Sequence, residues 1–180
     1  SENYFKRIYE TIDHKKLGTW EGELYFEMHR GTYTSQARTK RNNRRAEIMM
    51  HNIEFLYSYL DMLQGVDSFP KEQLRKMWEQ ILLNQFHDVL PGSSIRQVYE
   101  DTDRIYASLF EEGKELLDKA GMRLAAYCGC GQNDLLVINT TGFERNDVVF
   151  VPYSEKIHEK NGFEENGEAV VSQNLSDGIL

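Results

Sequence analysis

The sequence predicts a mainly α protein: a three-helix bundle, preceded by a loop-rich edge segment and followed by the first strands of a β domain. Apolar residues recur at spacings of three and four along three long stretches, and Gly or Pro residues separate these stretches. After a Gly-rich hinge at 129–131, short runs of β-branched and aliphatic residues take over. We therefore divide the 180 residues into 1–36, 37–127 and 128–180.

The edge segment, 1–36, shows no long periodic pattern. A stretch rich in Gly and Thr contains Trp20, Leu24, Tyr25, Phe26 and Met28, and this aromatic and apolar content predicts packing against another part of the protein. The first residues contain no initiator Met, no basic region and no apolar leader. We expect a segment of a longer chain without a secretory signal.

Two of the predicted helices have clear start and stop signals. The first is predicted over 37–64, where one apolar stripe precedes Gly65. The second is predicted from Pro70, a favourable first-turn residue, to about Leu90, because Pro91 disfavours helical geometry in the residue before it. The stripe of the first helix is Met49, Ile53, Leu56, Leu60 and Leu63, and the second helix carries Leu74, Met77, Trp78, Ile81, Leu82 and Val89.

The third helix is predicted from Ser94 to about Ala126. Ser94 and Gln97 have the spacing of a capping box, and apolar residues recur behind them. Three amphipathic helices with short connections bury their stripes most simply against one another. Beyond the hinge, strands are predicted at 135–138 and 148–151, with a weaker one at 169–171.

Composition limits the classes of function. The chain is 40% hydrophobic and 28% charged, with a net charge of −8, which indicates a globular protein and disfavours nucleic acid and anionic membranes as partners. The basic residues Arg38, Lys40, Arg41, Arg44 and Arg45 are an exception, and we interpret them as a solvated or ion-paired helix face rather than a nucleic-acid site.

The only two cysteines, Cys128 and Cys130, are too few for a disulfide framework or a four-cysteine zinc site. A reduced pair in a cytoplasmic protein is therefore expected. Several tyrosines lie at helical spacing and are assigned to the bundle rather than to sugar stacking.

The most informative segment is Asn84-Gln-Phe-His-Asp-Val-Leu-Pro-Gly-Ser-Ser-Ile95. His87 and Asp88 stand side by side before a Pro-Gly break, off the apolar stripe, where side chains can project from the end of a bundle. One imidazole cannot hold a metal without partners, so a surface histidine without a ligand role remains an alternative.

This segment resembles the middle domain of the α-mannosidases of glycoside hydrolase family 38. A second stretch, Glu21-Gly-Glu-Leu-Tyr-Phe-Glu-Met-His-Arg-Gly-Thr-Tyr-Thr-Ser-Gln36, resembles the region just before that domain in the bacterial and cytosolic branch of the family. The resemblance implies that 1–36 is the edge of an absent catalytic α/β barrel. It also implies that the C-terminal residues begin a large β domain and that the whole is a retaining glycosidase acting on terminal α-D-mannosides.

The resemblance further assigns roles to individual residues. It implies that His87 is a ligand of one Zn²⁺ ion whose other ligands lie on the barrel, and that Asp88 binds sugar hydroxyls. Glu27, His29 and Arg30 are candidate substrate contacts, with the alternative that Arg30 pairs with Glu27 or with an upstream carboxylate. No catalytic residue is expected in this segment, so the chain alone should be inactive.

Two other classes of function stay open at this point: a non-enzymatic helical interaction module and a carbohydrate-binding module. The expected partners are a mannoside or oligosaccharide substrate and the barrel and β domains of the same protein. Homo-oligomerisation is left open. The His87-Asp88 pair separates the enzyme hypothesis from the other two, because an interaction module does not need it.

Overall fold

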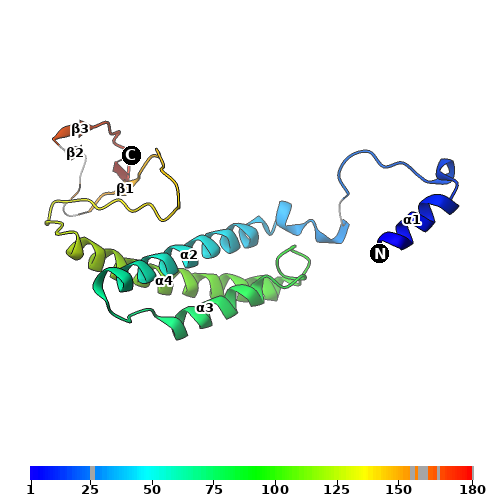
Figure 1. The fold of residues 1–180 in the computed structure, drawn as a ribbon, viewed down its shortest axis with the longest axis horizontal. Helices are drawn as coiled ribbons and strands as arrows, with labels where there is room; N and C mark the ends of the chain where they lie inside the picture. Colours follow the sequence, from blue (N-terminus) through cyan, green and yellow to red (C-terminus); the bar gives the residue numbers. More distant parts are fainter. Residues whose placement is uncertain (25–26, 155–156, 158–161, 166, 180) are drawn as a thin grey trace.

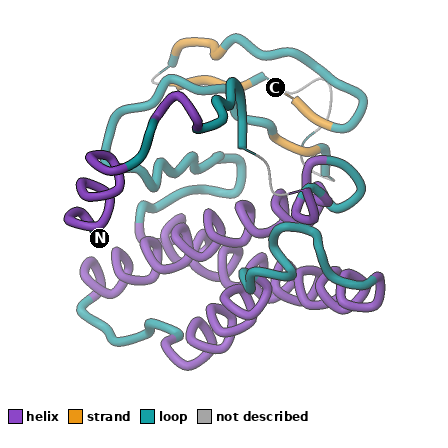
Figure 2. The backbone as a smooth tube through the Cα atoms, turned by 90° about the vertical axis from the view of Figure 1, so that its right-hand side faces the viewer, coloured by secondary structure: helices purple, strands orange, loops and turns teal. Residues whose placement is uncertain are grey.

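The chain is dominated by three long helices that lie side by side (Figure 1). This computed structural model describes residues 1–24, 27–154, 157, 162–165 and 167–179. The helices are α2 (Ala37–Gln64), α3 (Lys71–Asn84) and α4 (Arg96–Tyr127). The strands gather apart from them (Figure 2). The predicted three-helix bundle is therefore confirmed. None of the described helices combines the length and apolarity that a membrane span requires.

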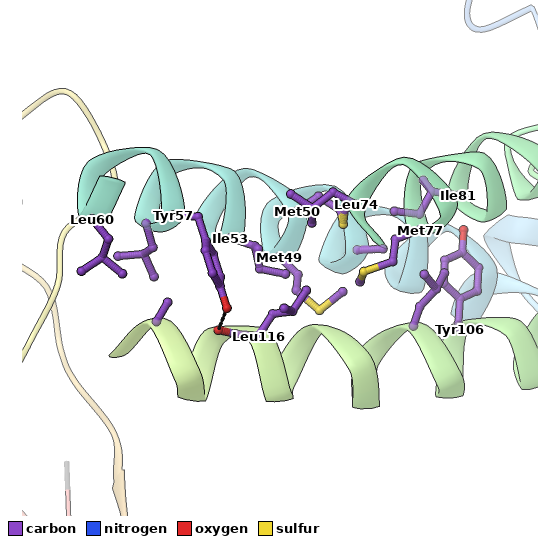
Figure 3. Packing of buried hydrophobic residues seen from close by; sticks show 14 of the residues in the cluster. Met49, Met50, Ile53, Tyr57, Leu60, Leu74, Met77, Ile81, Tyr106 and Leu116 are labelled. Atoms are coloured by element: carbon purple, nitrogen blue, oxygen red, sulfur yellow. Dashed lines mark hydrogen bonds between the residues drawn. The ribbon is translucent and has the colours of Figure 1, made fainter. Parts of the chain in front are cut away.

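The predicted apolar stripes form the core between these helices (Figure 3). In α2, Leu63 is partly buried and the other four stripe residues are buried. Of the apolar residues predicted for the second helix, Leu74, Met77 and Ile81 are buried in α3, whereas Leu82 is 59% exposed. From α3 and α4 the core receives Leu74, Met77, Ile81, Tyr106, Leu109, Leu116, Ala120 and Leu124.

The helix ends test the predicted start and stop signals. Gly65 ends α2 in the left-handed conformation, with φ of 65°, and its N–H donates to the Asp61 carbonyl at 2.9 Å, as a glycine stop signal predicts. The predicted end of the second helix at Leu90 is wrong, because α3 ends at Asn84. Beyond Asn84 the backbone forms tight turns, in which the Phe86 N–H donates to the Leu83 carbonyl at 3.2 Å.

The N-terminal segment contains a helix that the periodicity did not reveal. Helix α1 (Glu2–Thr11) is only ten residues long and buries none of them. Three short 3-10 helices follow: η1 (His14–Lys16), η2 (Glu27–His29) and η3 (Gly31–Tyr33). Trp20, Leu24 and Met28 are 68%, 79% and 83% exposed. Tyr25 and Phe26 lie outside the described residues. The predicted packing of this segment against another part of the protein stays a prediction.

The C-terminal segment forms two small antiparallel sheets instead of the strands predicted nearest the bundle. Strand β1 (Val151–Pro152) pairs with β4 (Gly178–Ile179), and β2 (Phe163–Glu165) pairs with β3 (Glu168–Val170). The strand predicted at 135–138 is wrong, and only the last residue of 148–151 lies in a strand. In the first of these runs, Leu136 and Ile138 are partly buried and pack against the helical core, so these apolar residues cover the bundle instead of pairing in a sheet.

Candidate functional site

His87 and Asp88 lie in the turn that joins α3 to α4, at the end of the bundle away from the strands (Figure 1). We call residues 85–92 the α3–α4 turn. Its backbone closes on itself, because the Val89 and Leu90 N–H groups both donate to the Phe86 carbonyl, at 2.9 and 3.0 Å. The Gly92 N–H then donates to the Val89 carbonyl at 3.1 Å. The two candidate residues thus sit on an ordered turn rather than on a helix.

The His87 and Asp88 side chains face solvent and each other. The distance from His87 Nε2 to Asp88 Oδ2 is 3.5 Å, and the side chains are 75% and 54% exposed. The Phe86 ring, itself 52% exposed, lies 4.1 Å from the imidazole between centroids. Neither polar side chain is used in core packing, as the sequence predicted. Both are available to an ion or ligand that approaches the bundle end.

The backbone carbonyl of Asp88 is fastened to the beginning of α4. The Ser94 hydroxyl donates to it at 2.6 Å, and the Ser93 and Tyr99 hydroxyls lie 3.4 Å from it. The predicted capping box is therefore wrong: the N-cap of α4 is Ile95, and Ser94 bonds the turn instead. Tyr99 is 5% exposed, and its oxygen also accepts from the Ser94 N–H at 2.9 Å.

The second candidate segment meets this turn through two glycines. A Cβ atom on Gly31 would lie 2.2 Å from the Gly92 carbonyl oxygen, so the two backbones are in direct contact. The Thr32 N–H donates to the Pro91 carbonyl at 3.3 Å. The structure therefore brings together, at the bundle end, the two segments that the sequence singled out, and Thr32 and Pro91, which are in contact there, are 59 positions apart in the chain.

The individual residues of the second segment stay candidates. Glu27 lies in η2, and its side chain lies outside the described residues. His29 is half-buried and Arg30 is exposed. Their predicted contact with a substrate, or the alternative pairing of Arg30 with a carboxylate, stays a prediction.

A polar cluster behind the α3–α4 turn was not foreseen. The Gln85 amide N–H group donates to Asn43 Oδ1 at 3.0 Å and to Glu47 Oε1 at 2.9 Å. The Tyr106 hydroxyl lies 3.4 Å from the same Asn43 oxygen, and burial, together with the charge of Glu47, raises the pKa of Tyr106 to about 12. The spacing of Asn43 and Glu47, one helical turn apart, was the available sequence signal.

His87 and Asp88 form only part of a metal site. Among the described residues, no group of three or more His, Cys, Asp or Glu side chains is arranged to hold an ion. Cys128 and Cys130 are free thiols just beyond the far end of α4. A metal bound by His87 would therefore take further ligands from outside the described residues.

The basic residues at the start of α2 are engaged with neighbours in the chain. Four of the five have such a neighbour: Arg38 pairs with Asp103, Arg44 lies 3.0 Å from Glu47, Lys40 lies over the Tyr33 ring and Arg45 over the Phe110 ring. These contacts agree with the interpretation as an ion-paired helix face.

Known proteins are similar to this chain in sequence and in fold. Residues 27–124 match the family model described as the α-mannosidase middle domain. The chain is 51% identical over 164 residues to α-mannosidase G of Dictyostelium discoideum, covering 78% of this chain and 15% of that protein. It is 40% identical over 142 residues to α-mannosidase 2C1 of Mus musculus, covering 78% of this chain and 13% of that protein.

A solved structure supports the fold. The crystal structure of an α-mannosidase from Enterococcus faecalis aligns with a TM-score of 0.54 and 20% identity, covering 97% of this chain and 23% of that one. The chain thus spans 13% to 15% of the length of the two curated relatives. Because the matched region contains the whole of α2 and α3 and nearly all of α4, the chain belongs to the α-mannosidase middle-domain family.

Proposed function

We propose that this chain is the central part of a zinc-dependent, retaining α-mannosidase that hydrolyses terminal α-D-mannosides. In this proposal His87 is a ligand of the zinc ion and Asp88 binds hydroxyl groups of the sugar. One observation carries it: an exposed imidazole and carboxylate, 3.5 Å apart, on a clamped turn of an α-mannosidase middle domain. The two curated relatives to which the chain is 51% and 40% identical are named α-mannosidases.

The chemistry of His87 fits a zinc ligand. Zn²⁺ prefers the neutral nitrogen of an imidazole and carboxylate oxygens, and catalytic sites usually have three protein ligands and one open position. The imidazole is exposed and lies on a turn whose backbone is held by hydrogen bonds, so it can join ligands from a neighbouring domain without rearranging the bundle. A bound zinc ion would polarise the sugar hydroxyls that it contacts.

The chemistry of Asp88 fits a sugar contact. An ionised carboxylate accepts hydrogen bonds at two oxygens, and vicinal sugar hydroxyls are donors. The Ser94 hydroxyl holds the Asp88 backbone carbonyl while leaving the carboxylate 54% exposed. A fixed backbone with an accessible carboxylate keeps the orientation of these hydrogen bonds and lowers the entropy lost on binding.

The remaining groups that glycoside hydrolysis needs would come from elsewhere in the protein. A retaining enzyme uses two carboxyl groups, one as nucleophile and one as acid and base, about 5 to 5.5 Å apart. In this proposal both lie on a barrel domain that contacts the α3–α4 turn. Free thiols at Cys128 and Cys130 suit a reducing compartment, so we place the enzyme in the cytoplasm.

The experiment compares His87→Ala with Asp88→Asn in the full-length gene product. His87→Ala removes a ligand, so zinc content and mannosidase activity should fall together, with partial recovery in excess zinc. Asp88→Asn keeps the shape but removes the charge, so zinc content should hold while kcat/KM falls on the order of a hundredfold, about 2.7 kcal/mol of transition-state stabilisation.

The matched control is His51→Ala, which removes another exposed histidine, from the middle of α2. It should leave both zinc content and activity unchanged. Retention of full zinc content and normal turnover by folded His87→Ala would refute the assignment of His87. An inactive wild-type protein that still binds mannosides would instead favour the carbohydrate-binding module.

A further inference from the structure

The polar cluster of Gln85, Asn43, Glu47 and Tyr106 lies between the apolar core and the α3–α4 turn. It joins three elements, because Asn43 and Glu47 come from α2, Tyr106 from α4 and Gln85 from the residue just after α3. The Asn43 amide also donates to Glu47 Oε1 at 3.1 Å. Asn43 is 9% exposed and Tyr106 is fully buried.

Core packing does not require a cluster of this kind. A buried polar group costs free energy unless it is hydrogen-bonded, and apolar residues of similar volume would pack the helices equally well. The cluster occurs where the bundle ends and the turn begins, and its Gln85 donates to two acceptors on another helix. Its geometry therefore fixes where the turn starts relative to α2.

Gln85 precedes His87 by two residues, so its side chain controls the backbone that leads to the imidazole. On the other side of His87, the Asp88 carbonyl is held by Ser94 at 2.6 Å. His87 is thus enclosed between two attachments, one to α2 through Gln85 and one to the start of α4 through Asp88. A loss of either attachment leaves the imidazole on a turn that is free to shift.

We propose that Gln85 is a positioning residue: by donating to Asn43 and Glu47 it holds the α3–α4 turn so that the imidazole of His87 stands where a metal ion binds. This inference rests on the proposed function, in which His87 is a metal ligand. Gln85 does not touch the metal or the substrate and acts through the backbone of the turn. Its loss should weaken metal binding in a protein that is still folded.

The donor and acceptor pattern provides a specific test. In Gln85→Glu, residue 85 can no longer donate and its charge faces Glu47, so the attachment fails. In Glu47→Gln, residue 47 still offers a carbonyl oxygen to Gln85, so the attachment holds. In the double variant Gln85→Glu, Glu47→Gln, the donor and acceptor are exchanged, and Asn43 can rotate its amide to donate to the new carboxylate.

The experiment measures the dissociation constant of Zn²⁺ for the full-length protein by competition with a chromophoric chelator. Groups that orient a metal ligand typically change metal affinity 10- to 100-fold. We expect Gln85→Glu to weaken zinc binding by about tenfold, and the double variant to return to within about threefold of the wild type. The visible spectrum of the Co²⁺-substituted protein should change in Gln85→Glu and recover in the double variant.

The matched control is Gln73→Glu, the same change at an exposed position of α3, which should leave zinc affinity unaltered. Unchanged affinity in Gln85→Glu, or no recovery in the double variant, would overturn the inference. If circular dichroism shows that Gln85→Glu is unfolded, zinc affinity is measured instead in the uncharged variant Gln85→Met, and unchanged affinity in that variant would overturn the inference. His87→Ala in the same assay tests the proposed function separately. Unchanged zinc affinity in His87→Ala would refute the assignment of His87 as a metal ligand, whereas unchanged affinity in Gln85→Glu alone would refute only the positioning role of Gln85.

Discussion

The contact between Gly31 and Gly92 leads to a prediction about how the α3–α4 turn is held. Gly92 has φ of +85°, and a Cβ atom there would lie 2.6 Å from the Thr32 nitrogen and 2.7 and 2.8 Å from the carbonyl carbon and Cα of Gly31. All three are backbone atoms, so no side-chain rotation can relieve the contact. In Gly92→Ala the turn must move away from η3.

The cost can be estimated from two contributions. A residue other than glycine in the left-handed region costs roughly 1–2 kcal/mol. Separation of the two backbones also breaks the bond from the Thr32 N–H to the Pro91 carbonyl, at 3.3 Å, which contributes about 0.5–1.5 kcal/mol. Gly92→Ala should therefore destabilise the chain by ~2–3 kcal/mol.

Gly129→Ala is the matched control. Gly129 has φ of +74°, but no atom lies within 4 Å of a Cβ atom built there. Gly129→Ala should therefore be destabilised only by the cost of a left-handed alanine, roughly 1–2 kcal/mol. The difference between the two variants isolates the contact with η3. Urea denaturation followed by helical circular dichroism measures both free energies of unfolding.

Hydrogen exchange at the Thr32 amide provides a local measurement of the same effect. Exchange should accelerate in Gly92→Ala and stay unchanged in Gly129→Ala, because only the first variant breaks the bond to Pro91. Equal free energies of unfolding for the two variants, together with unchanged exchange at Thr32, would refute the reasoning.

Two further predictions concern pH. Burial, and then the charge of Glu47, raises the folded pKa of Tyr106 from 10.0 to about 12. The contribution of the Tyr106 hydroxyl to the stability of the fold is therefore complete below pH 10 and is lost as the pH rises through about 12. Stability should fall less steeply with rising pH in Tyr106→Phe than in the wild type. A hydrogen bond from the Ser68 hydroxyl is the main cause that lowers the pKa of Asp61 below 3.8. The contribution of the Asp61 carboxylate to stability is present above pH 3.8 and is lost as the pH falls through the lower folded pKa. In Asp61→Asn, the urea midpoint of unfolding should therefore fall less steeply as the pH is lowered.

The helical part of the fold was predictable because its signals are local. The stripe of α2 lies on one helix face, and Gly65 adopts the left-handed conformation that a glycine stop signal implies. The end of α3 was not predictable in this way. Pro91 restricts only the residue before it, whereas the chain leaves the helix six residues earlier, after Asn84. The turn that follows is held by bonds from Ser94 to the Asp88 carbonyl and from Thr32 to the Pro91 carbonyl. Neither bond belongs to a repeating helical pattern.

The strands were also poorly predicted, because their formation depends on partners that are distant in the sequence. A short apolar run forms a strand only if a partner strand is available, and in the run at 135–138 Leu136 and Ile138 instead cover the helical core. Of the site, the sequence predicted the exposed pair His87 and Asp88. It could not predict the attachment of Gln85 to Glu47, because these residues are 38 positions apart and meet only once the helices pack.

The misplaced end of α3 bears on why the candidate ligand lies on a turn. In a helix that continued to Leu90, the Asp88 carbonyl would lie in the last helical turn, and the side chains of residues 85–90 would be spaced regularly around the helix axis. Because the helix stops at Asn84, the chain turns so that the Asp88 carbonyl accepts from Ser94 and the Gln85 side chain reaches α2. Irregular backbone with buried polar groups is costly unless each group is bonded. The hydrogen bonds of Gln85 and of the Asp88 and Pro91 carbonyls tie the turn to α2, to the start of α4 and to η3, and the imidazole of His87 stays exposed at the bundle end.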